Sequence, residues 1–179
     1  LVVAKDEVTH RNLAQQLFHK TTEREYNSIV WGKFKEKAGT IEERIGHDRS
    51  NKKKYMVVKD ETLGKNAITN YEVLEEYDFL SLVKLNLKTG RTHQIRVHMA
   101  FKGHPVFGDE MYGGREPVKN IQMTGSLKSR IKNLLELMPR QALHARVLGF
   151  FHPVKKEQMR FEAELPEDMR MLLDKVKGL

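Results

Sequence analysis

The sequence of 179 residues contains no cysteine, which excludes disulfide bonds and thiolate metal sites. It contains no apolar run long enough to span a bilayer, and its first residues lack the pattern of a signal peptide. Internal repeats and low-complexity linkers are also absent. These absences predict a cytoplasmic protein without a membrane partner, and the length predicts one compact domain with a core of its own.

Positive charge, in contrast, is in excess. The 32 lysine and arginine residues outnumber the 24 aspartate and glutamate residues, so the formal net charge is +8. A balance of this sign predicts a polyanionic partner, with nucleic acid ahead of a membrane surface. Residues 33–54 are charged and weakly periodic. This pattern fits two interpretations equally well: a solvated loop, or a basic arm that contacts the RNA backbone.

A strand followed by a basic helix start organises the middle of the chain. Apolar and polar residues alternate over 83–87, which is typical of a strand with one apolar face. Gly90 supplies a turn, and from Arg91 the spacing becomes helical until Gly103. The free N–H groups of such a helix start favour anions, and Arg91 and Arg96 add guanidinium groups suited to carboxylate or phosphate. The same pattern also fits a solvated helix with two surface ion pairs.

The order of the other predicted elements mixes hairpins with single helices. This order favours an α+β fold, a mostly antiparallel mixed β-sheet with flanking helices. The strand at 26–31 carries large apolar groups on both faces, so we expect it to be covered on both sides. Periodicity predicts further strands over 1–4, 55–58, 67–73, 141–151 and 159–165, and helices capped by Thr9 and over 126–138 and 167–176.

One long motif resembles that of a known family. It consists of residues 87–98, Leu-Lys-Thr-Gly-Arg-Thr-His-Gln-Ile-Arg-Val-His, followed by Gly-His-Pro at 103–105 and Gly-Asp at 108–109. This run resembles the motif of the RluA-type RNA pseudouridine synthases. The resemblance extends from Leu1 to about Asp168, nearly the whole chain, and implies the catalytic domain of such a synthase.

The resemblance implies two catalytic residues, Tyr26 and Arg96. Tyr26 lies in a segment similar to one in which a basic residue, here Arg24, precedes the active-site tyrosine by two positions. That tyrosine is expected to help remove a proton from the uracil ring, whereas taken alone it reads as a core tyrosine. Arg96 is expected to pair with the catalytic aspartate, because a carboxylate in a partly apolar pocket needs an opposite charge to keep its pKa low.

The sequence departs from the family at that aspartate. The family's His-Arg-Leu-Asp motif is absent here, and the run at 1–5 resembles the strand that shortly follows it. We therefore expect the domain, residues 1–179, to be N-terminally incomplete, with the aspartate upstream of Leu1 and Arg96 left without a carboxylate. Asp6, Asp48 and Asp109 lie outside the context of the motif.

RNA is the implied partner, with ribosomal RNA ahead of transfer RNA. The reaction implied is the isomerisation of a flipped-out uridine to pseudouridine by a protein without cofactors, expected to be a monomer. Four residues of the motif are expected to contact RNA, the first of them through phosphate: Arg91, Thr92, His93 and Gln94. A non-catalytic RNA-binding domain that retains the synthase fold is the alternative.

The histidines raise the question of a metal-dependent hydrolase. His93, His98 and His104 do not have the i, i+4 spacing with a glutamate that marks a zinc helix, so no metal is expected. His144 matches a strand of the family, and we expect it to be a buried structural histidine.

Overall fold

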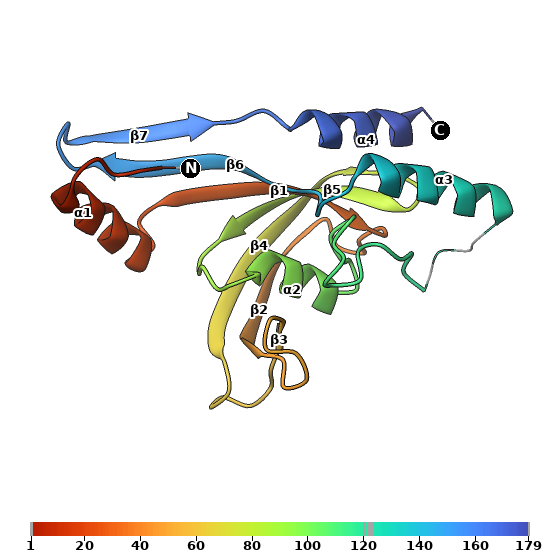
Figure 1. Cartoon of the computed structure of the whole chain (residues 1–179), viewed down its shortest axis with the longest axis horizontal. Coiled ribbons are helices and arrows are strands. Elements are labelled where there is room, and N and C mark those ends of the chain that lie inside the picture. Colours follow the sequence, from red (N-terminus) through yellow and green to blue (C-terminus); the bar gives the residue numbers. More distant parts are fainter. Residues whose placement is uncertain (1, 120, 122–123, 179) are drawn as a thin grey trace.

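The computed structural model describes residues 2–119, 121 and 124–178, and its fold is α+β. Figure 1 shows the elements in space. In chain order they are α1 (Glu7–Phe18), β1 (Glu23–Trp31), β2 (Ala38–His47), β3 (Tyr55–Val57), β4 (Lys65–Glu76), β5 (Leu80–Leu87), α2 (Gln94–Phe101), α3 (Gly125–Leu137), β6 (Leu143–His152), β7 (Glu157–Glu162) and α4 (Glu167–Lys177). Among the described helices, none is long and apolar enough to cross a membrane.

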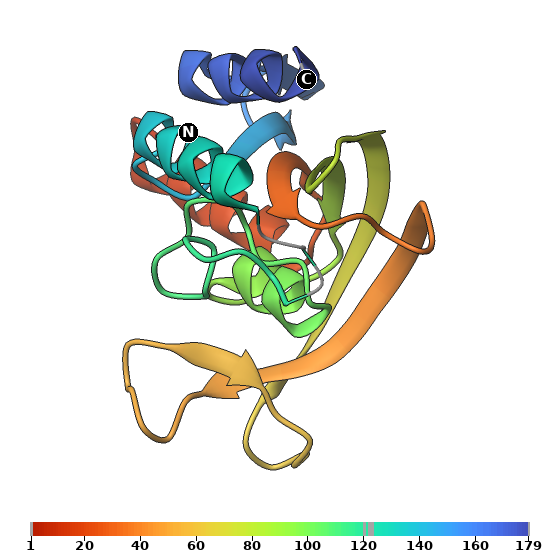
Figure 2. The same ribbon diagram turned by 90° about the vertical axis from the view of Figure 1, so that its right-hand side faces the viewer.

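The strands form one twisted sheet in the order β3-β2-β4-β5-β1-β6-β7. All its strand pairings within the described residues are antiparallel, so the predicted mixed character is absent there. The predicted hairpin of β4 and β5 is present. Helices α2 and α4 lie on opposite sides of the central strands, and the second view shows how β2 and β4 curve past α2 (Figures 1 and 2).

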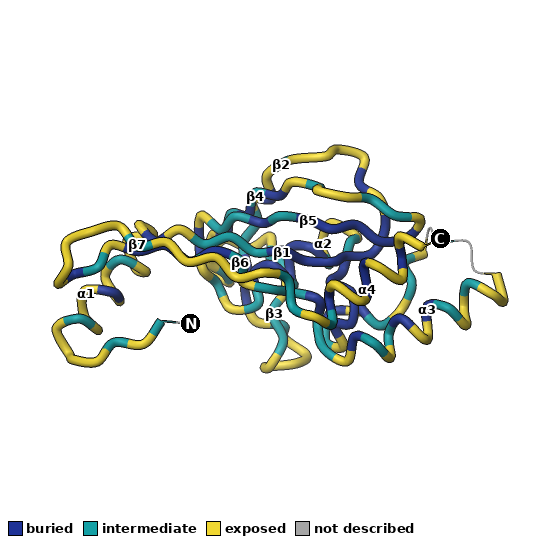
Figure 3. Tube along the Cα trace, turned by 90° about the horizontal axis from the view of Figure 1, so that it is seen from above, coloured by how far each residue is buried: buried dark blue, intermediate teal, exposed yellow. Residues whose placement is uncertain are grey.

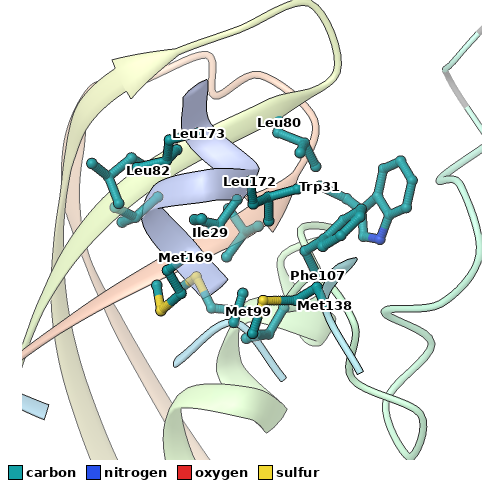
Figure 4. Packing of buried hydrophobic residues seen from close by; sticks show 14 of the residues in the cluster. Ile29, Trp31, Leu80, Leu82, Met99, Phe107, Met138, Met169, Leu172 and Leu173 are labelled. Carbon is teal, nitrogen blue, oxygen red and sulfur yellow. The ribbon is translucent and has the colours of Figure 1, made fainter. Parts of the chain in front are cut away.

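The core is centred on β1, whose residues 27–31 are buried on both faces, as predicted. Trp31 is fully buried, and its indole N–H donates to the carbonyl of Gly114 at 2.8 Å. The predicted apolar stripe of α4 packs onto the same core through Met169, Leu172 and Leu173 (Figure 4). Burying each such side chain contributes about 1.5–3 kcal/mol, so this region anchors the sheet. Burial falls off toward α1 and β7, which are largely exposed (Figure 3).

The predicted strand at the N-terminus is wrong. Residues 2–4 have no regular structure, and α1 follows them after two residues. Asp6 caps this helix, its carboxylate accepting the N–H of Thr9 at 2.7 Å, so the predicted cap Thr9 lies inside the first turn. An apolar run becomes a strand only where a neighbour supplies hydrogen-bond partners, and the strong cap at Asp6 starts a helix instead.

The region 33–54 is more regular than either sequence interpretation implied. Strand β2 occupies ten of these residues and pairs with β4 from Ala38 to Ile45. Ile41 and Ile45 are buried and flank the charged run Glu42-Glu43-Arg44. This pattern identifies a strand only when β4 lies alongside. The loop after β2 is ordered by Asp48, whose carboxylate accepts the N–H of Ser50 at 2.8 Å.

Candidate active site

Tyr26 lies on β1 at the side of a cavity of about 610 Å³. Strands β6 and β7 supply most of the other walls, and Val2, Val3 and Leu17 close it from the N-terminal side. Tyr26 is half-buried, and its ring packs against the edge of the main core. The tyrosine is therefore held by the sheet at a concave surface, which is a position from which a side chain can meet a substrate.

Arg24 lines the same cavity, two residues before Tyr26 on the same strand. Its guanidinium lies so close to Gly90 that a Cβ at residue 90 would come within 2.8 Å of Nη1. The Nε atom of Arg24 is buried and has no hydrogen-bond partner among the described residues. Arg24 thus places positive charge between the Tyr26 cavity and the turn before α2.

That turn, residues 89–93, is held together by Gln94. The Gln94 carbonyl accepts the hydroxyl of Thr89 at 2.7 Å and the backbone N–H of Arg91 at 2.9 Å. Its amide donates to the Ile68 carbonyl and to the Thr69 hydroxyl, both at 3.0 Å. With only 2 % of its surface exposed and its polar atoms bonded internally, Gln94 does not fit the predicted contact with RNA. Its role is to fasten the turn to β4.

The helix starts at Gln94, three residues later than predicted. Arg91 and Thr92 precede it, and His93 adopts the left-handed conformation with φ 55°. The side chain of Gln94 takes the Arg91 N–H out of any helical pattern, which accounts for the late start. Arg91 is half-buried and Thr92 exposed, so both can still reach a ligand.

Arg96 has a carboxylate partner within the chain, so the expectation that it would be left unpaired is wrong. Its Nε and Nη2 donate to the two Asp109 carboxylate oxygens at 2.6 and 2.7 Å. Asp109 is 1 % exposed and also accepts the backbone N–H groups of Met111 and Tyr112. The Tyr112 ring lies 4.8 Å from the guanidinium. The hydrogen bonds to Asp109 raise the pKa of Arg96, and the pair is a rigid charged clamp.

His93 belongs to the same cluster. Its Nδ1 lies 2.9 Å from the hydroxyl of Tyr112, and its ring meets that of Tyr55 edge-on. Burial lowers the pKa of His93, and the charge of Arg96 adds to the effect. His93 is therefore a neutral, half-buried side chain near neutral pH.

His98, rather than His144, is the buried structural histidine. It is fully buried, and burial lowers its pKa to about 4. Its Nδ1 lies 2.9 Å from the Thr69 hydroxyl, which also accepts a hydrogen bond from the Gln94 amide. His144, predicted to be buried, is only half-buried on β6, with Nε2 3.2 Å from the Ala163 carbonyl.

The described residues contain no group of three histidine, cysteine or acidic side chains placed to hold a metal ion. The structure instead gathers Tyr26, Arg24 and the turn at 89–93 on one side of β1. Arg96 is absent from the residues that line the Tyr26 cavity. The sequence singled out Tyr26 and Arg96 and included Asp109 in the family motif, but it did not show that Asp109 pairs with Arg96, because that contact forms only in the folded chain.

Two solved structures share this fold. Human RNA Pseudouridylate Synthase Domain Containing 4 superposes with a TM-score of 0.75, over 96% of this chain and 69% of that chain, at 21% identity. Human RNA Pseudouridylate Synthase Domain Containing 1 gives a TM-score of 0.69 over 99% of this chain and 74% of that chain, at 22% identity. The architecture is that of a pseudouridine synthase domain.

Sequence similarity defines the family. Residues 1–101 match the profile described as RNA pseudouridylate synthase, and the chain belongs to this family, in its RluA-type branch. It is 43% identical over 178 residues to an uncharacterised RNA pseudouridine synthase of Chlorobaculum parvum, covering 99% of this chain and 54% of that protein. It is 40% identical to ribosomal large subunit pseudouridine synthase D of Pseudomonas aeruginosa, covering 97% of this chain and 51% of that protein. The chain spans about half the length of the curated relatives that it matches.

Proposed function

We propose that this chain forms most of the catalytic domain of an RNA pseudouridine synthase whose substrate is a specific uridine in structured ribosomal RNA. The observation that carries the proposal is the placement of Tyr26 in a cavity between β1, β6 and the N-terminal segment, with Arg24 beside it. Ribosomal RNA is favoured over transfer RNA because relatives about 40% identical are described as ribosomal large subunit synthases. The net charge of +8 suits such a polyanion.

The reaction is an isomerisation and needs no oxidant, reductant or water. The bond between the uracil N1 and the ribose C1′ breaks, the base turns, and C5 forms a new bond to C1′. The proton on C5 is then lost, and N1 gains one. Because the bond is hidden in stacked RNA, the uridine is flipped into the Tyr26 cavity, where the tyrosine handles the C5 proton.

The carboxylate that attacks the ribose, or assists proton abstraction there, comes in this proposal from an aspartate upstream of Leu1. Val2 and Val3 line the same cavity as Tyr26, so the N-terminal segment reaches the pocket proposed for the uridine. Arg96 supports this carboxylate. Its Nε and Nη2 donate to Asp109, which orients the guanidinium, and among the described residues no hydrogen bond engages its Nη1.

Tritium release from RNA labelled at C5 of uridine tests the proposal. The full-length protein containing this chain is expected to release tritium from ribosomal RNA fragments and not from transfer RNA. Tritium release from transfer RNA alone would contradict ribosomal RNA as the substrate, but it would still support the proposed reaction. RNA binding without any release would favour the alternative, a non-catalytic RNA-binding domain.

A further inference from the structure

A second cavity, of about 370 Å³, lies between the β2–β3 hairpin and the turn at 89–93. It shares no lining residue with the Tyr26 cavity. The two are nevertheless neighbours, because Gly90 lines the second cavity and packs against Arg24, which lines the first. This proximity allows a polymer whose uridine occupies the Tyr26 cavity to reach the second cavity with an adjacent part of its chain.

Two aromatic rings form one wall of the second cavity. His47 and Tyr55 face each other on paired strands, with ring centroids 4.4 Å apart and planes inclined by 35°. Tyr55 is held in place, since its backbone N–H donates to the Tyr112 hydroxyl at 3.0 Å and its ring abuts His93. His47 is exposed. Such a preformed ring pair presents a π-face on which any nucleobase can stack.

The same cavity also carries positive charge along its wall. Arg91 lines it, and a hydrogen bond from its Nε to the Asn66 carbonyl at 3.1 Å orients the guanidinium. Thr92 and Lys65 add a hydroxyl and an ammonium group. The nearby Asp60 carboxylate is turned into its own loop by the N–H and hydroxyl of Thr62. The wall therefore suits a phosphate next to the stacked base.

We propose that this second cavity binds one unpaired nucleotide of the substrate RNA, close in the chain to the target uridine. Its base stacks on the His47–Tyr55 pair, and its phosphate is held by Arg91 and Thr92. The inference rests on the proposed function, because it takes the bound polymer to be RNA. The enzyme then contacts the RNA at a nucleotide other than the reacting uridine. This contact requires an unpaired nucleotide but does not depend on which base it carries.

The test measures the affinity of the full-length protein for a fluorescein-labelled single-stranded oligouridylate at several salt concentrations. Tyr55→Leu keeps an apolar side chain but removes the stack, and should weaken binding about tenfold without changing the salt slope. His47→Gln, on an exposed side chain, should weaken binding in the same way and carries little risk to folding. Arg91→Ala should instead make the logarithmic salt slope shallower by about one unit.

Met56→Ala is the matched control, because Met56 is exposed on the same strand and does not line the cavity. It should leave affinity unchanged. Unchanged affinity in both Tyr55→Leu and His47→Gln, with normal tritium release by the unsubstituted protein, would overturn the second site and leave the proposed function standing. Absence of both binding and release in the unsubstituted protein would overturn the proposed function, and the inference with it.

Discussion

At the scale of single residues, Asp109 and Gln94 are buried polar side chains that each have several hydrogen-bond partners. Asp109 collects four donors, two from Arg96 and two from the backbone. Gln94 connects the 89–93 turn to β4 through both ends of its amide. Groups of this kind cost free energy when a partner is removed, so their substitution has measurable consequences.

Tyr26→Phe in the full-length protein should lower turnover by about 10²-fold or more while RNA affinity stays nearly constant. The reason is that the substitution removes only the hydroxyl and leaves the ring in its packing position. Single-turnover tritium release measures the chemical step separately from binding. A near-normal rate would remove Tyr26 from the mechanism.

Asp109→Asn should destabilise the domain by about 3–5 kcal/mol, because it leaves the guanidinium of Arg96 largely buried without its countercharge. Urea unfolding monitored by tryptophan fluorescence measures the loss. Asp60→Asn serves as control, since that carboxylate is exposed and bonded only within its own loop. Equal stability of the two variants would contradict the account of the Arg96–Asp109 pair.

His98 predicts a dependence of stability on pH. Burial lowers its pKa from 6.5 to about 4, so within this interval the unfolded chain binds a proton that the folded chain does not. The free energy of unfolding should therefore fall as pH is lowered from 6.5 to 4, with His98 contributing about 3 kcal/mol of that fall. Urea unfolding at several pH values between 6.5 and 4 measures this fall. In the His98→Gln variant, the free energy of unfolding should depend less on pH than in the unsubstituted protein. An identical profile in the variant would exclude His98 as the cause.

At the scale of elements, α2 and the turn before it form one unit with β4. The turn depends on Gln94 because its residues, 89–93, all lie outside any helix or strand, and the hydrogen bonds that hold it run to β4 and to its own backbone. Strand β2 likewise exists through β4, with which it pairs from Ala38 to Ile45. The turn before α2 and strand β2 therefore both depend on contacts with β4, which is distant from them in the sequence.

Gln94→Leu should cost about 2–4 kcal/mol, since it leaves the Arg91 N–H and the buried Thr89 hydroxyl without the carbonyl that accepts them. It should also weaken RNA binding, because Arg91 loses its fixed position. Thr92→Ala, at an exposed neighbour, should leave stability unchanged. Thermal unfolding compares the two, and similar melting temperatures would show that Gln94 does not organise the turn.

At the scale of the whole molecule, the sheet places two cavities on either side of the contact between Arg24 and Gly90. A polypeptide limited to residues 1–179 retains both cavities and the Arg96–Asp109 pair. We expect it to bind RNA and to form no pseudouridine, because the proposed carboxylate lies upstream. The tritium assay on this polypeptide and on the full-length protein decides the point, and robust turnover by the shorter one would refute the proposed aspartate.

Periodic patterns in the sequence predicted most elements of the fold. The alternation of apolar and polar residues before Thr89 indicated β5, and the apolar stripe at 169–176 indicated α4. An element that buries one face leaves a periodic pattern of apolar residues in its own sequence, so such elements can be predicted locally. The same reasoning failed at residues 1–4 and 38–47. There the outcome depends on whether a strand from elsewhere in the chain lies alongside.

The sequence by itself determined the α+β class, the positive charge, the motif at 87–98 and the strand that carries Tyr26. Each of these follows from composition or from residues close together in the chain. Only the tertiary structure decided that Arg96 pairs with Asp109, that Gln94 faces β4, and that His47, Tyr55 and Arg91 share one cavity. Hydrogen bonds and stacking act over a few ångströms between residues far apart in sequence, so they are set by the packing of the sheet rather than by any local pattern.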